Sequence, residues 1–308
     1  MSPPLLLLAL PSGTNAGAGD PRTLVDLAVS AEAAGVDGVI MTDHVLIGDR
    51  TDRYPWGEFP YPPDAPWLEP LTVLTAIATA TERLVLTTGV LVVPLRPATL
   101  LAKQVATLDL LSGGRVVLGV GTGWQAEEFT AQGLDPAERG QLLTDHIAAC
   151  RMLWRFAPAS FESASVSFDR VWSEPRPTNR GGPPVLFAGT LTPRNLHRIV
   201  DLGDGWIPIM GTTVDGVADG VAMLRQAYAD AGRDPGELRV RAPLPLAKAA
   251  EGGGRDLAAS MGRLPDVLAG GATEVSVPSS PFVAADDPGV ASWLDELGDA
   301  WRSTVRTA

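Results

Sequence analysis

The chain has 308 residues, of which 45% are hydrophobic and 19% charged, and its formal net charge at pH 7 is −12. Nucleic-acid binders normally carry an excess of basic residues, so 36 acidic against 24 basic side chains argue against that class and against binding to an anionic membrane. The single cysteine, Cys150, excludes an internal disulfide and is typical of the reducing cytoplasm.

The longest purely apolar run, residues 5–10 (LLLLAL), lies near the N-terminus. It is too short for a membrane span or for the apolar region of a signal peptide. We therefore expect a strand here, in a soluble cytoplasmic protein without a membrane partner.

Eight short apolar runs alternate with longer segments of helical spacing. The predicted strands are residues 5–10, 36–42, 84–93, 115–120, 184–188, 205–209, 238–246 and 273–277. Unbroken apolar runs are typical of strands covered on both faces, as in a parallel sheet. The clearest helix signals predict helices starting at Asp20-Pro21 and covering residues 97–111, 215–231 and 257–269. Eight such pairs favour a single (β/α)₈ barrel domain over residues 1–308, with a doubly wound open sheet as the alternative.

Two long insertions interrupt this rhythm. Residues 43–67 follow the second predicted strand and are rich in proline and aromatic residues. Long loops in compact domains are often functional, and this one leaves the catalytic end of a barrel, so we interpret it as a lid or pocket wall. Residues 157–182 follow the fourth helix and contain a predicted short hairpin around residues 166–171.

The chain has three histidines, of which His44 is the best catalytic candidate. It follows Asp43 at the end of the second strand, over the barrel mouth, where an imidazole can act as a general acid or base. His146 lies in the middle of a helix and is interpreted as structural, and His197 faces either a phosphate or solvent. No metal-binding motif is present, so no metal site is predicted.

Two glycine-containing segments follow the fourth and fifth strands. Gly119, Gly121 and Gly123 form a GxGxG pattern, whereas a Rossmann fold needs GxGxxG after its first strand, so we interpret them as room for a flat ligand. Residues 189–193 (GTLTP) enter a helix with Thr192 as its N-cap. Such a turn is either an ordinary helix cap or, with Arg194 and His197 nearby, a phosphate site.

Together these residues resemble the luciferase-like monooxygenase superfamily, and within it the oxidoreductases that use the deazaflavin coenzyme F420. The resemblance covers roughly residues 20–280. It rests on the order and spacing of Met41-Thr42-Asp43-His44-Val45, residues 67–124, LGDGWIP (202–208) and AYADAGRDPGELRV (227–240).

The resemblance implies a barrel with the coenzyme across its mouth and a homodimeric assembly. It implies His44 as the acid/base residue, Asp43 as a coenzyme contact and a cis peptide bond at Gly89-Val90 beneath the ring. The other implied coenzyme contacts are Val92, Thr122 and Gly123 at the ring, and Gly189, Thr190, Leu191 and Thr192 at the phosphate.

Trp124 departs from the pattern of the family's sugar-phosphate dehydrogenases, which have a glutamate at this position. An indole cannot act as a general base, and the basic residues that would hold a sugar phosphate are not evident. We therefore interpret Trp124 as an apolar wall of the substrate pocket and expect a neutral or aromatic substrate.

The expected function is an F420-dependent oxidoreductase that transfers hydride between the deazaflavin and a C=O, C=C or C=N bond of a small molecule, with His44 moving the proton. An FMN-dependent monooxygenase is the alternative, and a non-catalytic flavin-binding barrel is a second one. The substrate, the direction of hydride transfer and the cofactor's identity stay open at this point.

Overall fold

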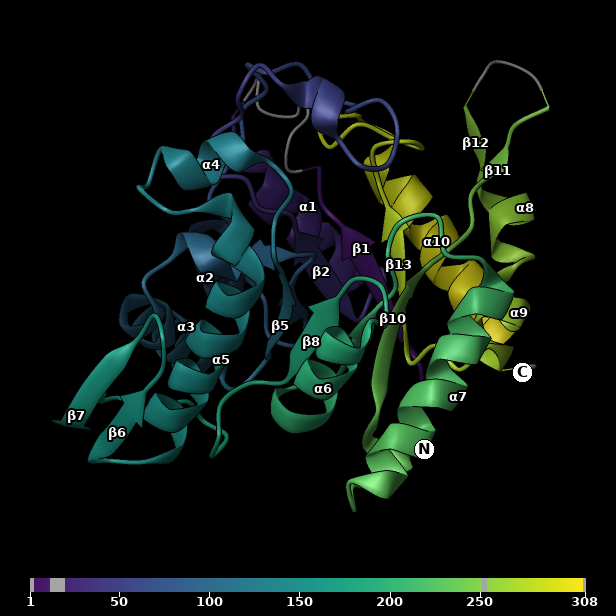
Figure 1. The fold of residues 1–308 in the computed structure, drawn as a ribbon. Coiled ribbons are helices and arrows are strands. Elements are labelled where there is room, and N and C mark those ends of the chain that lie inside the picture. The colour runs from purple at the N-terminus through teal and green to yellow at the C-terminus, as the bar shows by residue number, and fades with distance from the viewer. Residues whose placement is uncertain (1–2, 12–19, 251–253, 307–308) are drawn as a thin grey trace.

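The computed structural model describes residues 3–11, 20–250 and 254–306. Within them, parallel strands β1, β2, β3, β5, β8, β9, β10 and β13 pair in one continuous order, and β3 also pairs with β5, which closes the barrel (Figure 1). The predicted (β/α)₈ barrel is therefore confirmed, and the alternative prediction of a doubly wound open sheet is wrong. The strands are β1 (Leu5–Ala9), β2 (Gly38–Met41), β3 (Val85–Thr88), β5 (Val116–Gly121), β8 (Val185–Ala188), β9 (Gly205–Ile207), β10 (Arg239–Pro243) and β13 (Glu274–Pro278).

All eight predicted strands are present, but the run predicted over residues 84–93 is divided. Its second piece, β4 (Leu91–Val92), pairs with the end of β5. Between the pieces the Gly89-Val90 peptide bond is cis, as the resemblance implies. We call residues 89–90 the bulge; they carry the chain out of the β3 ladder at the carboxyl end of the strand.

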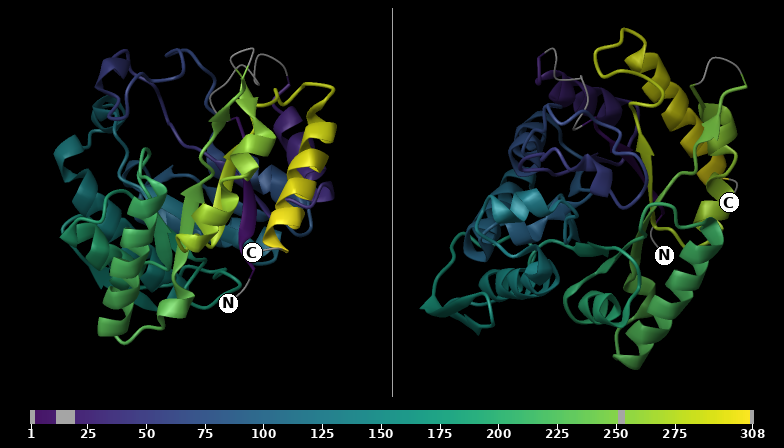
Figure 2. Two further views of the ribbon diagram at one scale, coloured as in Figure 1. Left: turned by 90° about the vertical axis from the view of Figure 1, so that its right-hand side faces the viewer. Right: turned by 45° about the horizontal axis from the view of Figure 1, so that its top comes forward.

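Helices surround the barrel, as both views of Figure 2 show. They are α1 (Thr23–Ala33), α2 (Pro70–Ala80), α3 (Ala98–Ser112), α4 (Ala126–Thr130), α5 (Arg139–Arg155), α6 (Pro193–Leu202), α7 (Val214–Asp230), α8 (Leu257–Met261), α9 (Leu264–Ala269) and α10 (Val290–Val305). Short 3₁₀ turns are η2 (Thr51–Arg53), η3 (Val93–Leu95), η4 (Pro136–Glu138) and η5 (Pro235–Glu237). The core lies between the strands and these helices, with Trp154, Tyr228 and Phe187 among its fully buried side chains.

Two helix predictions need correction. The helix predicted over residues 257–269 is two helices, α8 and α9, because Pro265 has no N–H to donate and its ring would clash with the carbonyl of Met261. The first helix begins at Thr23 and not at Pro21, because Asp20 starts a turn in which its carbonyl accepts from the Thr23 N–H at 3.0 Å.

The two insertions lie at opposite ends of the barrel in Figure 1. Residues 43–67, the mouth loop, lie with α4 at the upper end, where the parallel strands end. The second insertion contains a hairpin at the lower end, formed by β6 (Ala159–Glu162) and β7 (Ser167–Val171); the range predicted for it, residues 166–171, covers only the second strand. A second small antiparallel pair is formed by β11 (Ala247–Lys248) and β12 (Arg255–Asp256).

Candidate active site

His44 is held against a buried carboxylate at the mouth of the barrel. Its Nδ1 lies 3.2 Å from Glu128 Oε2, and the Val45 N–H donates to Glu128 Oε1 at 2.8 Å. The Glu128 side chain is fully buried and that of His44 is 10% exposed. When the neutral ring donates from Nδ1 to the carboxylate, Nε2 is left as the basic nitrogen.

Glu128 is a candidate site residue to which the sequence analysis assigned no role. It lies on α4, 84 positions away from His44 along the chain. Its neighbour Glu127 has the same side chain, and nothing in the local pattern distinguishes the two. Only the packing of α4 against the start of the mouth loop brings Glu128 to the histidine.

Asp43 points to a different partner. Its Oδ2 accepts from Arg96 Nη1 at 2.6 Å and from the Val92 N–H at 2.8 Å, and its Oδ1 accepts from Arg96 Nη2 at 2.9 Å. Burial raises the pKa of the Asp43 carboxyl, against the opposing effect of the Arg96 guanidinium. The carboxylate thus joins the end of β2 to β4, and its contact with a coenzyme stays a prediction.

Aromatic rings of the mouth loop surround His44. The Trp67 ring centroid lies 4.6 Å from that of His44 in an edge-to-face arrangement, and the Phe59 and Trp124 centroids each lie at 5.9 Å. Trp124 also contacts Phe59 at 5.3 Å and Tyr54 at 5.2 Å. The predicted wall residue Trp124 therefore lies in one aromatic cluster with the catalytic candidate.

Gly121, at the end of β5, and Gly123, just after it, pack against Val90 and Val92. A Cβ added to Gly121 would lie 2.7 Å from Val90 Cγ2, and one added to Gly123 would lie 2.6 Å from Val92 Cγ1. Gly123 also has a φ of +73°. Valine side chains thus take the room that the sequence interpretation assigned to a flat ligand. Coenzyme contacts of Gly89, Val90, Val92, Thr122 and Gly123 stay predictions.

The turn after β8 contains the N-cap of α6. Thr192 caps α6 by accepting from the Asn195 N–H at 3.3 Å, and Pro193 is the first helical residue, as predicted. Gly189 has a φ of +118°, and its carbonyl accepts from Trp206 Nε1 at 2.8 Å. Thr190 and Thr192 are exposed, and Leu191 is half-buried between them. Phosphate binding at residues 189–192 stays a prediction.

Of the other two histidines and the cysteine, His146 and Cys150 are buried, whereas His197 lies on the surface. His146 is buried with Nδ1 3.5 Å from the Val93 carbonyl, and burial lowers its pKa. Burial raises the pKa of Cys150 to about 12, far from the range of a reactive thiolate. His197 is exposed on α6.

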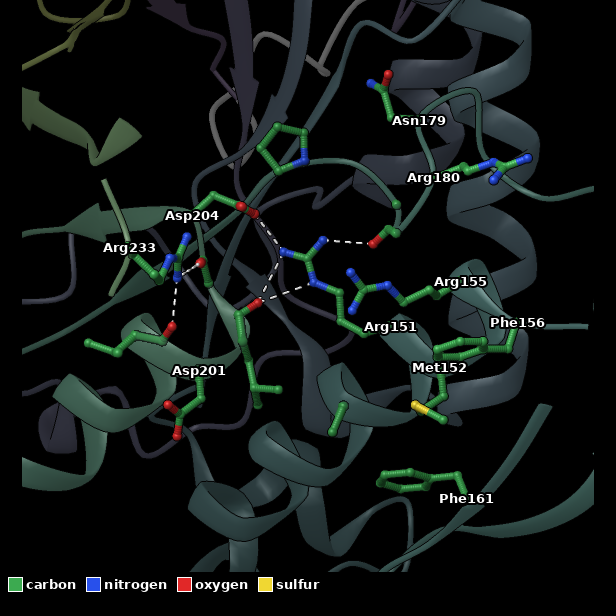
Figure 3. Close-up of a pocket in the computed structure, with 17 residues that line it drawn as sticks. Arg151, Met152, Arg155, Phe156, Phe161, Asn179, Arg180, Asp201, Asp204 and Arg233 are labelled. Carbon is green, nitrogen blue, oxygen red and sulfur yellow. Dashed lines mark hydrogen bonds and ion pairs between the residues drawn. The ribbon is translucent and has the colours of Figure 1, made fainter. Parts of the chain in front are cut away.

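A cavity of about 660 Å³ lies at the opposite end of the barrel, and no predicted site residue lines it (Figure 3). Arg151 donates there to the carbonyls of Leu202 at 3.0 Å and Gly181 at 2.8 Å and pairs with Asp204. Arg233 donates to the Gly203 carbonyl at 2.8 Å. These guanidiniums satisfy carbonyls at and beyond the end of α6, which is a structural task.

Within the described residues, no group of three or more His, Cys, Asp or Glu side chains could hold a metal ion. No helix in the same ranges is both long and apolar enough to cross a bilayer.

The chain is similar to proteins of known families in sequence and in structure. An uncharacterised protein of Mycobacterium tuberculosis is 36% identical over 167 residues, covering 54% of this chain and 58% of the relative. An F420-dependent glucose-6-phosphate dehydrogenase of Nakamurella multipartita is 31% identical over 224 residues, covering 71% and 61%. The match thus spans less than two thirds of either relative.

Solved structures share the fold at low sequence identity. A monooxygenase from Streptomyces bottropensis superposes with a TM-score of 0.78 at 19% identity, covering 99% of this chain and 100% of that one. An F420-dependent secondary alcohol dehydrogenase superposes with a TM-score of 0.76 at 16% identity, covering 97% and 98%. The sequence model of the luciferase-like monooxygenases matches residues 5–251, more than half of the chain, and the chain therefore belongs to that family.

Proposed function

We propose that this protein is an F420-dependent oxidoreductase that transfers hydride between the deazaflavin and a neutral or aromatic organic substrate. The observation that carries the proposal is the His44–Glu128 pair, which lies inside an aromatic cluster at the carboxyl ends of the barrel strands. The relative from Nakamurella multipartita, named as an F420-dependent dehydrogenase, supports the choice of coenzyme.

The residues present fit such a coenzyme. Only Asn195 Nδ2, at 3.6 Å, would meet a Cβ on Gly189, so the backbone of this turn is open to a ligand. The N-terminus of α6 beside it favours an anion, and the exposed Arg194 adds positive charge. In this proposal, residues 189–192 hold the phosphate of the coenzyme and the bulge supports its deazaflavin ring. When bound, the coenzyme supplies or accepts the hydride.

His44 moves the accompanying proton through Nε2. Glu128 fixes the ring from the Nδ1 side and stabilises the imidazolium that forms when Nε2 takes a proton. Trp67 and Phe59 cover the ring and exclude water from it. An acid/base group of this kind contributes a factor of about 10²–10⁴ in rate.

The proposed substrate class rests on Trp124 and Glu128 near His44. Trp124 offers one N–H donor and no proton acceptor. Glu128, four residues further on, already accepts from Val45 and faces His44, so it is not available as a base for a sugar hydroxyl. These contacts favour an apolar carbonyl, enone or imine over a sugar phosphate.

An FMN-dependent monooxygenase is the second candidate, because the matched family takes its name from that reaction. The cofactor decides between the two, since a deazaflavin does not readily form the oxygen adduct that monooxygenation requires.

The deciding experiment is a fluorescence titration of the purified protein with oxidised F420 and with FMN. We expect F420 to bind at least about tenfold more tightly, a difference of about 1.4 kcal/mol. A preference for FMN would favour the monooxygenase, and binding of neither would refute the proposal. Reduced F420 should then be oxidised by members of a panel of ketones, enones and imines. Glucose 6-phosphate, which donates hydride, is tested separately with oxidised F420 as the acceptor.

A further inference from the structure

We infer that Arg241 is a positioning residue, which sets the place of the bulge by hydrogen bonding across the barrel interior. The inference deepens the proposed function, because it concerns the segment that would support the coenzyme ring. Arg241 lies on β10 and is 2% exposed, and none of the sequence motifs includes it.

The guanidinium of Arg241 joins strands that are not neighbours. Its Nη1 donates to the Thr88 carbonyl at 2.9 Å and its Nη2 to Thr87 Oγ1 at 2.7 Å, both on β3. In the barrel β10 and β3 are separated by β13, β1 and β2 on one side and by β9, β8 and β5 on the other. The two hydrogen bonds therefore cross the interior and couple opposite walls.

The bonded carbonyl is directly beside the bulge. Thr88 is the last residue of β3, and the cis peptide follows at the next residue. The pairing of β3 with β5 ends at Thr87, one residue earlier. The Arg241 side chain therefore holds the strand at the residue where this pairing stops. Thr88 is anchored a second time by its hydroxyl, which donates to the Gly119 carbonyl at 2.7 Å.

Gly119 leaves the space in which this contact forms. A Cβ at Gly119 would lie 2.1 Å from the Thr88 carbonyl oxygen and 3.0 Å from Arg241 Nη1. The first residue of the GxGxG segment must therefore be glycine, because any side chain there would clash with the Thr88 carbonyl and crowd the Arg241 guanidinium.

The charge of Arg241 is balanced on its own side of the barrel. Its Nε donates to Glu274 Oε2 at 2.8 Å, while Arg239 Nε donates to Glu274 Oε1 at 2.8 Å. Buried ion pairs often contribute little net stability compared with well-packed apolar residues. Stability alone therefore gives a weak reason for this arrangement, whereas the hydrogen bonds from Arg241 to β3 give a geometric one.

The test compares Arg241→Met with Arg239→Met. Both remove an ion pair with Glu274, but only the first removes the bonds to β3, so the second is the matched control. Coenzyme dissociation constants are measured by fluorescence titration at a temperature where thermal unfolding shows both variants folded. We expect R241M to raise the constant by about tenfold or more and R239M by less than about twofold. Equal effects of the two variants, or no effect of R241M, would overturn the inference.

A second readout needs no coenzyme. Amide hydrogen exchange of peptides covering residues 86–93 should accelerate in R241M relative to the wild type and stay unchanged in R239M. If the wild type binds neither F420 nor FMN, the proposed function fails, and this exchange comparison alone decides the role of Arg241. Unchanged exchange in R241M would then refute it.

Should R241M not yield folded protein, Arg241→Lys replaces it. A lysine keeps the charge opposite Glu274, but one ammonium on an unbranched stem cannot reproduce the fork that reaches Glu274, Thr87 and Thr88 together. The same weakening of binding and faster exchange are expected, and wild-type values for both would refute the inference.

Discussion

The three histidines of the chain differ in their partners, and this difference separates the catalytic candidate from the other two. His44 has a fully buried carboxylate at one ring nitrogen, whereas Nδ1 of His146 lies 3.5 Å from the backbone carbonyl of Val93. His197 is exposed on α6. A buried carboxylate that accepts from a backbone N–H and faces an imidazole fixes the orientation of the ring, as acid/base chemistry requires.

Replacing His44 by Ala should lower turnover by about 10²-fold or more, because the proton transfer loses its group, with coenzyme affinity changed by only a few-fold. Glu128→Gln should lower kcat by about tenfold, since an amide cannot stabilise the imidazolium as a carboxylate does. Glu127→Gln is the matched control and should leave kcat unchanged. Steady-state kinetics with direct titration of the coenzyme measures these effects. Full turnover in H44A would remove His44 from the mechanism.

Trp124→Phe should keep most of the activity, because the proposed role of the indole is to shape the pocket. Trp124→Glu should weaken binding of the apolar substrate and should not create activity on glucose 6-phosphate, since the chain lacks evident residues to hold the sugar phosphate. Both variants are assayed with the same panel of ketones, enones, imines and glucose 6-phosphate. A folded, coenzyme-bound W124F without activity would refute the wall assignment, as would efficient oxidation of the sugar phosphate by the wild type.

At the scale of elements, the mouth loop reaches across the barrel opening. Tyr54 lies next to Trp124 and donates its hydroxyl to Met210 Sδ at 3.9 Å, in the loop that follows β9. In the barrel order β2 and β9 lie on opposite sides. The loop that leaves β2 therefore contacts the far rim, an arrangement suited to covering a bound ligand.

The N-terminus of α6 can be tested without disturbing the helix. Thr192→Asp keeps a good N-cap but places a negative charge where the coenzyme phosphate is proposed to lie, so affinity should fall by about tenfold. Thr213→Asp is the matched control, because Thr213 caps α7 in the same way by accepting from the Gly216 N–H at 3.1 Å. Coenzyme titration and thermal unfolding of both variants measure the effects. Equal affinities of the two variants would place the phosphate elsewhere.

At the scale of the whole molecule, the barrel encloses charges. Glu274 on β13 is 1% exposed and lies against Arg239 and Arg241. Burial by itself would raise the pKa of Glu274, but the two guanidiniums hold it below its usual value. A carboxyl with a lowered pKa in the folded state stabilises the fold at pH values above its unfolded pKa, and this contribution is lost as the pH falls through the folded pKa.

Glu274→Gln should therefore lower the free energy of unfolding at pH 7 by about 3 kcal/mol, because it leaves two arginines without their counter-charge. The difference from the wild type should shrink as the pH is lowered from about 5 to below about 4, since Glu274 of the wild type is then neutralised as well. Urea unfolding at a series of pH values measures it. A difference that is independent of pH would show that the ion pair does not contribute.

The strands, the barrel and the end of the barrel that carries the candidate site could be predicted from the amino-acid sequence. Apolar runs, helix caps and glycine stops are signals between residues that are close in the chain, so the eight barrel strands and the Thr192 cap could be predicted locally. His44 followed from its place after a strand, and the cis bond at Gly89-Val90 followed from the family resemblance.

Which side chains meet depends on how the elements pack in three dimensions. His44 and Glu128 are 84 positions apart, Asp43 and Arg96 are 53 apart, and Arg241 and Thr88 are 153 apart. The pairing of β3 with β2 and β5 brings the first two pairs together, whereas Arg241 reaches Thr88 across the closed barrel. The hydrophobic periodicity that specifies each strand carries no information about these partners. For the same reason the roles proposed for Glu128 and Arg241, neither of which lies in a sequence motif, could not be predicted from the sequence.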